Sequence, residues 1–316
     1  MLFYLTRRLL ISFPVLLGIT VISFIIMKLA PGNPVDMLID PNTPPELLDA
    51  KREMLGLNSS LPVQYWHWLK GLLHGQLGYS FSSYAPVAGM IGQRIGPTLL
   101  LALTALLTGL LTAIPLGIAS AVRHNKAFDH TMTGLAFIGL SIPPFFLGLS
   151  LIYVFALKLH WLPTGGMSTL GRGGGFSDTL HHLILPATVL AIGIVGKKIR
   201  YIRASMLDVL SQEYLRTARA KGVKESMVVY KHALRNALLP ILTVFGTEIP
   251  VLLGGSILVE QIFQWPGIGQ LTMQSILSRD YPTLMALNLV AAIVVMTSNL
   301  ITDILYSFAD PRIQYR

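Results

Sequence analysis

The chain has 316 residues, of which 53% are hydrophobic and 12% are charged, and its formal net charge is +9. Because a soluble domain usually carries roughly 25% charged residues, this composition disfavours an ordinary soluble fold. The lack of cysteine excludes disulfides, thiolate chemistry and Cys-based zinc or iron–sulfur sites, and the positive charge does not indicate nucleic acid, because ten of the 24 Lys and Arg lie within residues 197–235, beside an apolar segment.

Six apolar segments of near-bilayer length predict an all-α integral membrane protein with about six transmembrane helices. They are residues 9–30, 98–122, 134–157, 184–206, 238–262 and 284–308. The first segment is too long for a removable signal peptide, and no small-residue cleavage pattern follows it. We therefore expect it to remain as the first membrane helix.

Two of these segments have an internal irregularity. Pro143-Pro144 interrupts the third segment, so a helix there should be kinked or split. The apolar run of the fourth segment ends at Gly196. The basic residues that follow must snorkel or leave the bilayer, which predicts a cytoplasmic helical extension. These residues are Lys197, Lys198, Arg200 and Arg203.

The connection over residues 31–96 is long for a loop and contains helix-like pieces at 45–55 and 62–74. It is expected to form an extracytoplasmic loop domain that either covers the helices or docks a partner. The predicted organisation is therefore a tail and first helix at 1–30, this loop domain at 31–96, and a membrane core at 97–316 with a cytoplasmic loop at 207–237.

The basic residues predict the orientation of the chain. The N-terminus, residues 123–130, residues 197–235 and the C-terminal tail together hold 16 of the 24 Lys and Arg. The positive-inside rule therefore places both termini in the cytoplasm. All four tryptophans then fall at or near the outer interface, where an indole ring can be buried while its N–H stays wet. They are Trp66, Trp68, Trp161 and Trp265.

No catalytic or metal-binding motif is evident. The stretch 193–198 resembles a phosphate-binding loop but has the wrong spacing and ends in lysine, and no H-E-x-x-H pair exists. His181 and His182 are adjacent, so their side chains should diverge, and solvated histidines are expected there rather than ligands. Gly139-Leu140-Ser141 would need a histidine at matching depth to form an intramembrane protease, and no histidine lies in the middle of a predicted span.

The basic loop predicts a helix, a tight turn and a second helix. Helix-forming residues dominate before Gly222, and that glycine is a natural C-cap. The small residues Thr217, Ala218 and Ala220 would allow another backbone to approach closely. These features indicate either a docking element for a partner or an amphipathic surface helix on anionic lipid.

The segment 216–222, followed by His232-Ala233-Leu234-Arg235-Asn236 and residues up to Pro240, resembles the loop signature of ABC importer permeases of the peptide and nickel subfamily. Nearly the whole chain shares the resemblance, including residues 31–34, 75–78, 260–263, 265–267 and 310–312. The broad importer signature has Glu-Ala-Ala where this chain has Arg216, Thr217 and Ala218, and its proline comes earlier than Pro240.

The resemblance implies a type I ABC importer permease fold and transport of peptides, with nickel as the alternative solute. It implies a second homologous permease, two separate ATP-binding subunits that hold ATP and magnesium, an extracytoplasmic solute-binding protein, and no cofactor or catalysis in this chain. Gly222 would form the turn and residues 223–229 the coupling helix. The residues implied in coupling to the ATPase are Arg216, Thr217, Ala218, Ala220, Gly222, Val223, Lys224, Glu225, His232, Arg235 and Asn236.

Polar residues within the apolar segments are candidates for the translocation path. Asn288, Asn299 and Asp303 fall on one face of the last predicted helix, where interhelical hydrogen bonding is the alternative role. Glu248 is expected to be neutral, paired or exposed to a cavity, because a lone charge in the bilayer is costly. Glu260 and Trp265 are expected at a gate or interface. A secondary transporter remains the competing class, but paired broken helices and internal repeats are not evident.

Overall fold

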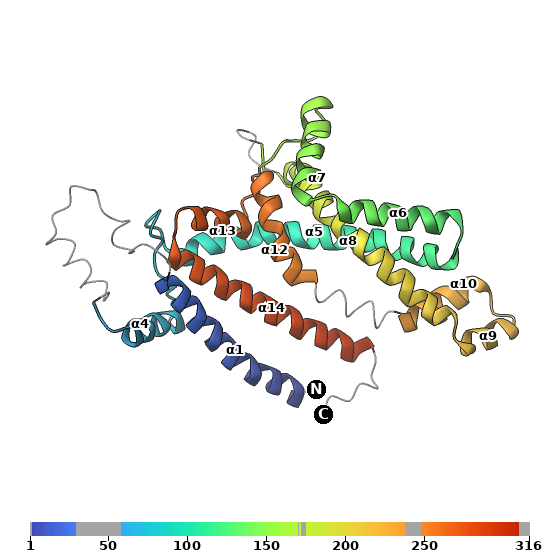
Figure 1. The fold of residues 1–316 in the computed structure, drawn as a ribbon, viewed down its shortest axis with the longest axis horizontal. Helices are drawn as coiled ribbons and strands as arrows, with labels where there is room; N and C mark the ends of the chain where they lie inside the picture. The colour runs from blue at the N-terminus through green and yellow to red at the C-terminus, as the bar shows by residue number, and fades with distance from the viewer. Residues whose placement is uncertain (1, 30–57, 170, 172–174, 238–247, 310–316) are drawn as a thin grey trace. The chain divides into compact units, whose positions relative to one another are not determined.

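The computed structural model describes residues 2–29, 58–169, 171, 175–237 and 248–309. These residues are mostly helical (Figure 1), and they form no named strand, apart from an isolated antiparallel bridge between Tyr79 and Pro86. The chain divides into two compact units, which are described separately below. Unit 1 contains residues 1–97 and 267–296, and unit 2 contains residues 98–266 and 297–316.

Unit 1 contains α1 (Leu2–Leu29), α4 (Leu61–Leu73), α13 (Ile268–Leu277) and the first parts of α5 (Val87–Val122) and α14 (Tyr281–Ala309). Its core joins Val87 and Ile91 of α5 to buried residues of α13 and α14. This packing explains why α5 begins at Val87, whereas the apolar run alone predicted a start at residue 98. The first turns of α5 are amphipathic and helical because their apolar side is buried.

Asp280 fixes the chain segment that leads into α5. Its buried carboxylate accepts hydrogen bonds from Ser80 Oγ at 2.5 Å, from the Phe81 amide at 3.0 Å and from Thr283 Oγ1 at 2.7 Å. Thr283 lies in the first turn of α14, so one carboxylate joins this helix to the residues before α5. Charge-assisted hydrogen bonds of this kind are stronger than neutral ones.

Unit 2 is built around α8 (Phe176–Leu210) and includes the rest of α5 and α14. Close helix contacts depend on glycine: a Cβ on Gly196 of α8 would lie 2.9 Å from the Ala136 carbonyl oxygen of α6 (Ala127–Ser141). A Cβ on Gly117 of α5 would lie 2.8 Å from the Ile202 side chain of α8. The other helices of the unit are α6 (Ala127–Ser141), α7 (Pro144–Leu151), the π-helix η1 (Ile152–Lys158), α9 (Glu213–Ala220), α10 (Glu225–Met227), the π-helix η2 (Val228–Ala233) and α12 (Glu248–Ile262).

Within the described residues, four helices are long and apolar enough to cross a membrane, and a bent pair makes a possible fifth span. The bent pair joins Ala127–Ser141 to Pro144–Lys158 at an angle of 97°. This confirms the break predicted at Pro143-Pro144, because a proline donates no backbone hydrogen bond to the preceding turn. α12 has 15 residues, and residues 238–247 of the expected fifth span lie outside the described part.

The predicted helix-like piece at 62–74 is confirmed as α4. The piece predicted at 45–55 lies outside the described residues. The fourth predicted span is also confirmed with its helical extension, because α8 continues without a break to Leu210.

Candidate functional site

The basic segment folds as a helix–turn–helix at the end of α8. Leu215 of α9 and the η2 residues Val228, Val229 and Ala233 are buried in one cluster with Met206 of α8 and its neighbours. The segment is therefore packed against the end of α8 by a hydrophobic core, and its exposed side consists mainly of charged and small residues. We refer to α9, the turn and α10 as the helix–turn–helix.

Gly222 forms the turn between α9 and α10. Its φ angle of +77° lies in the left-handed region, which side chains rarely adopt. The Gly222 amide donates to the Arg219 carbonyl at 2.9 Å, and the Val223 amide donates to the Ala218 carbonyl at 3.2 Å. This pair of bonds is a Schellman motif, so the predicted glycine C-cap is confirmed. A Cβ at Gly222 would meet no atom within 4 Å, so the backbone conformation alone favours glycine.

An ion pair closes the turn on its exposed side. Arg219 donates to Glu225 through Nε at 3.0 Å and through a terminal nitrogen at 2.8 Å. The guanidinium lowers the pKa of the Glu225 carboxyl, and the carboxylate raises the pKa of Arg219. Because both side chains are substantially exposed, this pair orients the turn more than it stabilises the fold.

Most of the residues predicted to couple to an ATPase are exposed on the helix–turn–helix or just after η2. They are Arg216, Thr217, Ala220, Gly222, Lys224, Glu225, Arg235 and Asn236. The other three, Ala218, Val223 and His232, are partly buried, and Ala218 and Val223 pack against this chain's own core. The coupling helix was predicted at 223–229. In the structure the corresponding helical segment begins at Glu225, with α10, and ends at Ala233, with η2.

Lys198 of α8 and Glu248 of α12 form a buried ion pair. The Lys198 Nζ lies 2.7 Å from Glu248 Oε1, and the two side chains are only 2% and 9% exposed. Lys198 is therefore buried inside the protein, so of the two outcomes expected for it, to snorkel or to leave the bilayer, the first is wrong. Glu248 is paired, which is one of the three states expected for it. No pattern in the sequence predicted that these two charged residues form a pair.

A second buried carboxylate, Asp129 of α6, connects three helices. Arg203 of α8 donates to both of its oxygens, at 2.5 and 2.7 Å. Ser120 of α5 donates to the same carboxylate, and the Asn125 amide donates at 3.0 Å. Sequence reasoning missed Asp129. An acidic residue in the first turn of a helix is a common surface feature, so only the tertiary structure identifies its role.

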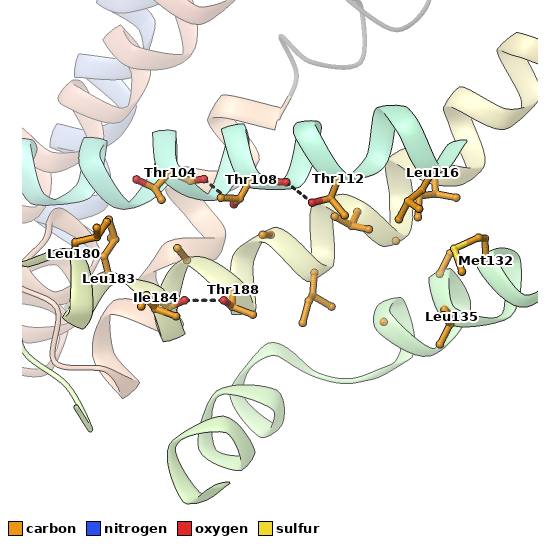
Figure 2. A pocket seen from close by; sticks show the side chains of 18 residues that line it. Thr104, Thr108, Thr112, Leu116, Met132, Leu135, Leu180, Leu183, Ile184 and Thr188 are labelled. Atoms are coloured by element: carbon orange, nitrogen blue, oxygen red, sulfur yellow. Dashed lines mark hydrogen bonds between the residues drawn. The ribbon is translucent and has the colours of Figure 1, made fainter. Parts of the chain in front are cut away.

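A groove of about 570 Å³ lies between α5, α6 and α8 (Figure 2). Thr104, Thr108 and Thr112 line its α5 side, one helical turn apart. The hydroxyls of Thr108 and Thr112 do not offer free donors to a solute, because each donates to the carbonyl four residues earlier. The groove is therefore an apolar surface within unit 2 rather than a polar binding site.

The other predicted site residues lie in different surroundings. Glu260 is fully buried and accepts a hydrogen bond from Thr98 Oγ1 at 2.9 Å. Trp265 is also fully buried, so its indole N–H is not at a wet interface as expected, whereas Trp66 is 61% exposed. Asn288 and Asn299 are both exposed on α14. In the isolated chain they therefore do not turn toward a neighbouring helix.

The side chain of His182, which lies on α8, is buried, so the expectation of a solvated histidine is wrong for this residue. Its Nδ1 lies 2.9 Å from the Gly165 carbonyl oxygen and its Nε2 lies 3.3 Å from Thr169 Oγ1. These contacts hold the segment before α8 against the helix and explain its burial. The described residues contain no group of three or more His, Cys, Asp or Glu that could hold a metal ion.

These features define a helical membrane protein of several spans that presents an exposed helix–turn–helix on the end of one long helix. Residues 113–315 match the family described as the inner membrane component of binding-protein-dependent transport systems, and residues 1–102 match the N-terminal component of the same proteins. The chain belongs to this family, and its fold is that of a type I ABC importer permease.

Curated relatives match over the full length. The chain is 48% identical over 313 residues to the oligopeptide transport system permease protein AppB of Bacillus subtilis, with 99% of each chain covered. It is 40% identical over 316 residues to the glutathione transport system permease protein GsiC of Salmonella choleraesuis, with 100% of each covered.

Solved structures share the fold at low sequence identity. A chain of the methionine ABC transporter MetNI in an inward-facing conformation matches with a TM-score of 0.60 and 16% identity, over 71% of this chain and 98% of that chain. A chain of an amino acid ABC transporter solved with histidines matches with a TM-score of 0.52 and 15% identity, over 70% and 94%.

Proposed function

We propose that this chain is a channel-forming permease subunit of an ATP-driven importer of peptides, and that separate ATPase subunits act on its helix–turn–helix. The observation that carries the proposal is an exposed turn held by Gly222 and packed firmly on the end of α8. A rigid lever of this kind suits an external motor. The names of the full-length relatives support a peptide as the solute.

The proposed assembly contains a second, homologous permease, two ATP-binding subunits that hold ATP and magnesium, and an extracytoplasmic solute-binding protein. This chain binds no cofactor and catalyses no reaction in the proposal. Both termini and the helix–turn–helix face the cytoplasm, because the basic residues are concentrated there. The membrane in question is the cytoplasmic membrane.

Mechanical coupling would follow the buried contacts. Movement of the ATPases displaces α9 and α10, and the cluster around Leu215 and Met206 passes the displacement to α8. The bidentate bond between Arg203 and Asp129 then carries α6 along with α8. Packed elements transmit displacement because interiors are dense and only slightly compressible.

The solute path is proposed to include Asn288 and Asn299, whose side chains are exposed on α14. Glu248 is proposed to act beside this path through its pairing with Lys198. Glu260 and Trp265 are buried, so we propose that they hold the helices around a gate rather than contact solute.

The test is uptake by the purified complex in liposomes, with an oligopeptide, glutathione and Ni²⁺ compared as solutes. We expect the oligopeptide to enter only when ATP is hydrolysed and the solute-binding protein is present. Accumulation of Ni²⁺ without peptide would instead support the nickel alternative. Uptake by the isolated chain on an ion gradient would overturn the proposal in favour of a secondary transporter.

A further inference from the structure

α4 packs along the end of a membrane-spanning helix. The apolar span of α1 covers Leu10–Leu29, which at 1.5 Å per residue is about 30 Å, the thickness of a bilayer core. The Tyr65 hydroxyl of α4 hydrogen-bonds to Thr20 of α1 at 2.8 Å. Thr20 lies nine residues before the end of that span, or about 14 Å along the helix.

A second set of contacts joins α4 to the same part of α1. The Phe24 ring of α1 lies 5.4 Å from the Tyr65 ring and 6.4 Å from the Trp68 ring of α4. Lys28, near the end of α1, donates to Gln64. The side of α4 that faces α1 therefore contacts α1 from the middle of its apolar span, at Thr20, to the C-terminal end of that span, at Lys28.

The opposite side of α4 is exposed and has two chemically different edges. Trp66 and Leu73 are 61% and 75% exposed. Being seven residues apart, they point within about 20° of each other on the helix. His67 and His74 are also exposed, and they share a direction about 100° away from the first pair. The exposed surface thus has Trp66 and Leu73 on one edge and His67 and His74 on the other, with Val63 and Lys70 between them.

We propose that α4 is an interfacial helix whose Trp66–Leu73 edge is inserted into the lipid leaflet at the C-terminal end of α1, with its His67–His74 edge in water. An amphipathic helix with an exposed tryptophan suits this position, since an indole is stable where apolar and wet regions meet. Lys70 lies between the two edges and is exposed, so its ammonium can reach the lipid headgroups. α4 then anchors the described residues before α5 to the membrane surface.

The chain contains no cysteine, so a single introduced cysteine has no labelling background from this chain. Trp66→Cys and His67→Cys are adjacent positions on the two edges, and Leu73→Cys with His74→Cys repeats the comparison one heptad later. Each variant is spin-labelled in the full transporter complex in lipid nanodiscs, after peptide uptake has shown that it is folded. Ser83→Cys, at an exposed position outside any helix, is the aqueous control.

The measurement is the collision rate of each label with oxygen, which concentrates in lipid, and with a water-soluble nickel chelate. We expect oxygen to dominate at positions 66 and 73, and the chelate to dominate at 67, 74 and 83. Equal accessibility on the two edges would overturn the proposal. So would labels at 66 and 73 that are shielded from both reagents, because a protein partner would then cover this edge.

Discussion

At the residue scale, the left-handed backbone of Gly222 limits the choice of amino acid at the turn of the helix–turn–helix. A side chain there would contact nothing, but the left-handed conformation costs an L-residue roughly 1–2 kcal/mol. We therefore expect Gly222→Val to disrupt the turn and greatly reduce ATP-dependent peptide uptake, with membrane insertion intact. Gly222→Asn is the matched control, because asparagine tolerates this conformation and should keep most of the uptake. Wild-type uptake by the valine variant would contradict the role of the turn.

The Lys198–Glu248 pair gives a second prediction at this scale. Removing one partner of a buried ion pair leaves an uncompensated charge and typically costs about 3–5 kcal/mol. We expect Lys198→Met to lower the unfolding temperature of the complex, and the double variant with Glu248→Gln to recover part of the loss. Lys197→Met, at the exposed neighbouring position, should have little effect. Equal unfolding temperatures for Lys197→Met and Lys198→Met would argue against the pair.

At the scale of elements, the bond between Arg203 and Asp129 is expected to hold α6 and α8 together. Asp129→Asn removes the charge that both guanidinium nitrogens contact, and charge-assisted hydrogen bonds are the strong ones. We expect lower thermal stability and less peptide transported per ATP hydrolysed. The amount of peptide transported per ATP reports coupling, whereas thermal stability reports folding.

Asp208→Asn is the control for that experiment, since Asp208 is an exposed carboxylate on α8, the helix that carries Arg203. It should leave both quantities unchanged. If Asp129→Asn transported as many peptides per ATP as the wild type, force transmission through this contact would be ruled out.

The elements also show where local sequence signals suffice. The break at Pro143-Pro144 and the turn at Gly222 were predicted correctly, because proline and glycine restrict the backbone wherever they occur. The start of α5 at Val87 was not predicted. It depends on burial of Val87 and Ile91 against residues almost 200 positions later in the chain, such as Leu271 and Leu287.

At the scale of the whole molecule, the orientation in the membrane remains a prediction from the charge distribution. In inside-out and right-side-out vesicles, Ala220→Cys should react with an impermeant maleimide only from the cytoplasmic side. Trp161→Cys should react only from the opposite side. Both positions are exposed in this chain, so burial within it would not explain a failure to react. Reaction of Ala220→Cys from outside would invert the topology.

The sequence by itself determined the class of protein, the helical membrane fold, the bent third span and the glycine-capped turn. The class of protein followed from the resemblance of its motifs to a known family, and the other three follow from composition, apolar run length and single-residue backbone limits, which act locally. Only the tertiary structure decided the partners of Lys198 and Asp129 and the burial of His182 and Trp265. Whether a charged or aromatic side chain is buried depends on which helices pack together. That packing involves contacts between residues far apart in the chain.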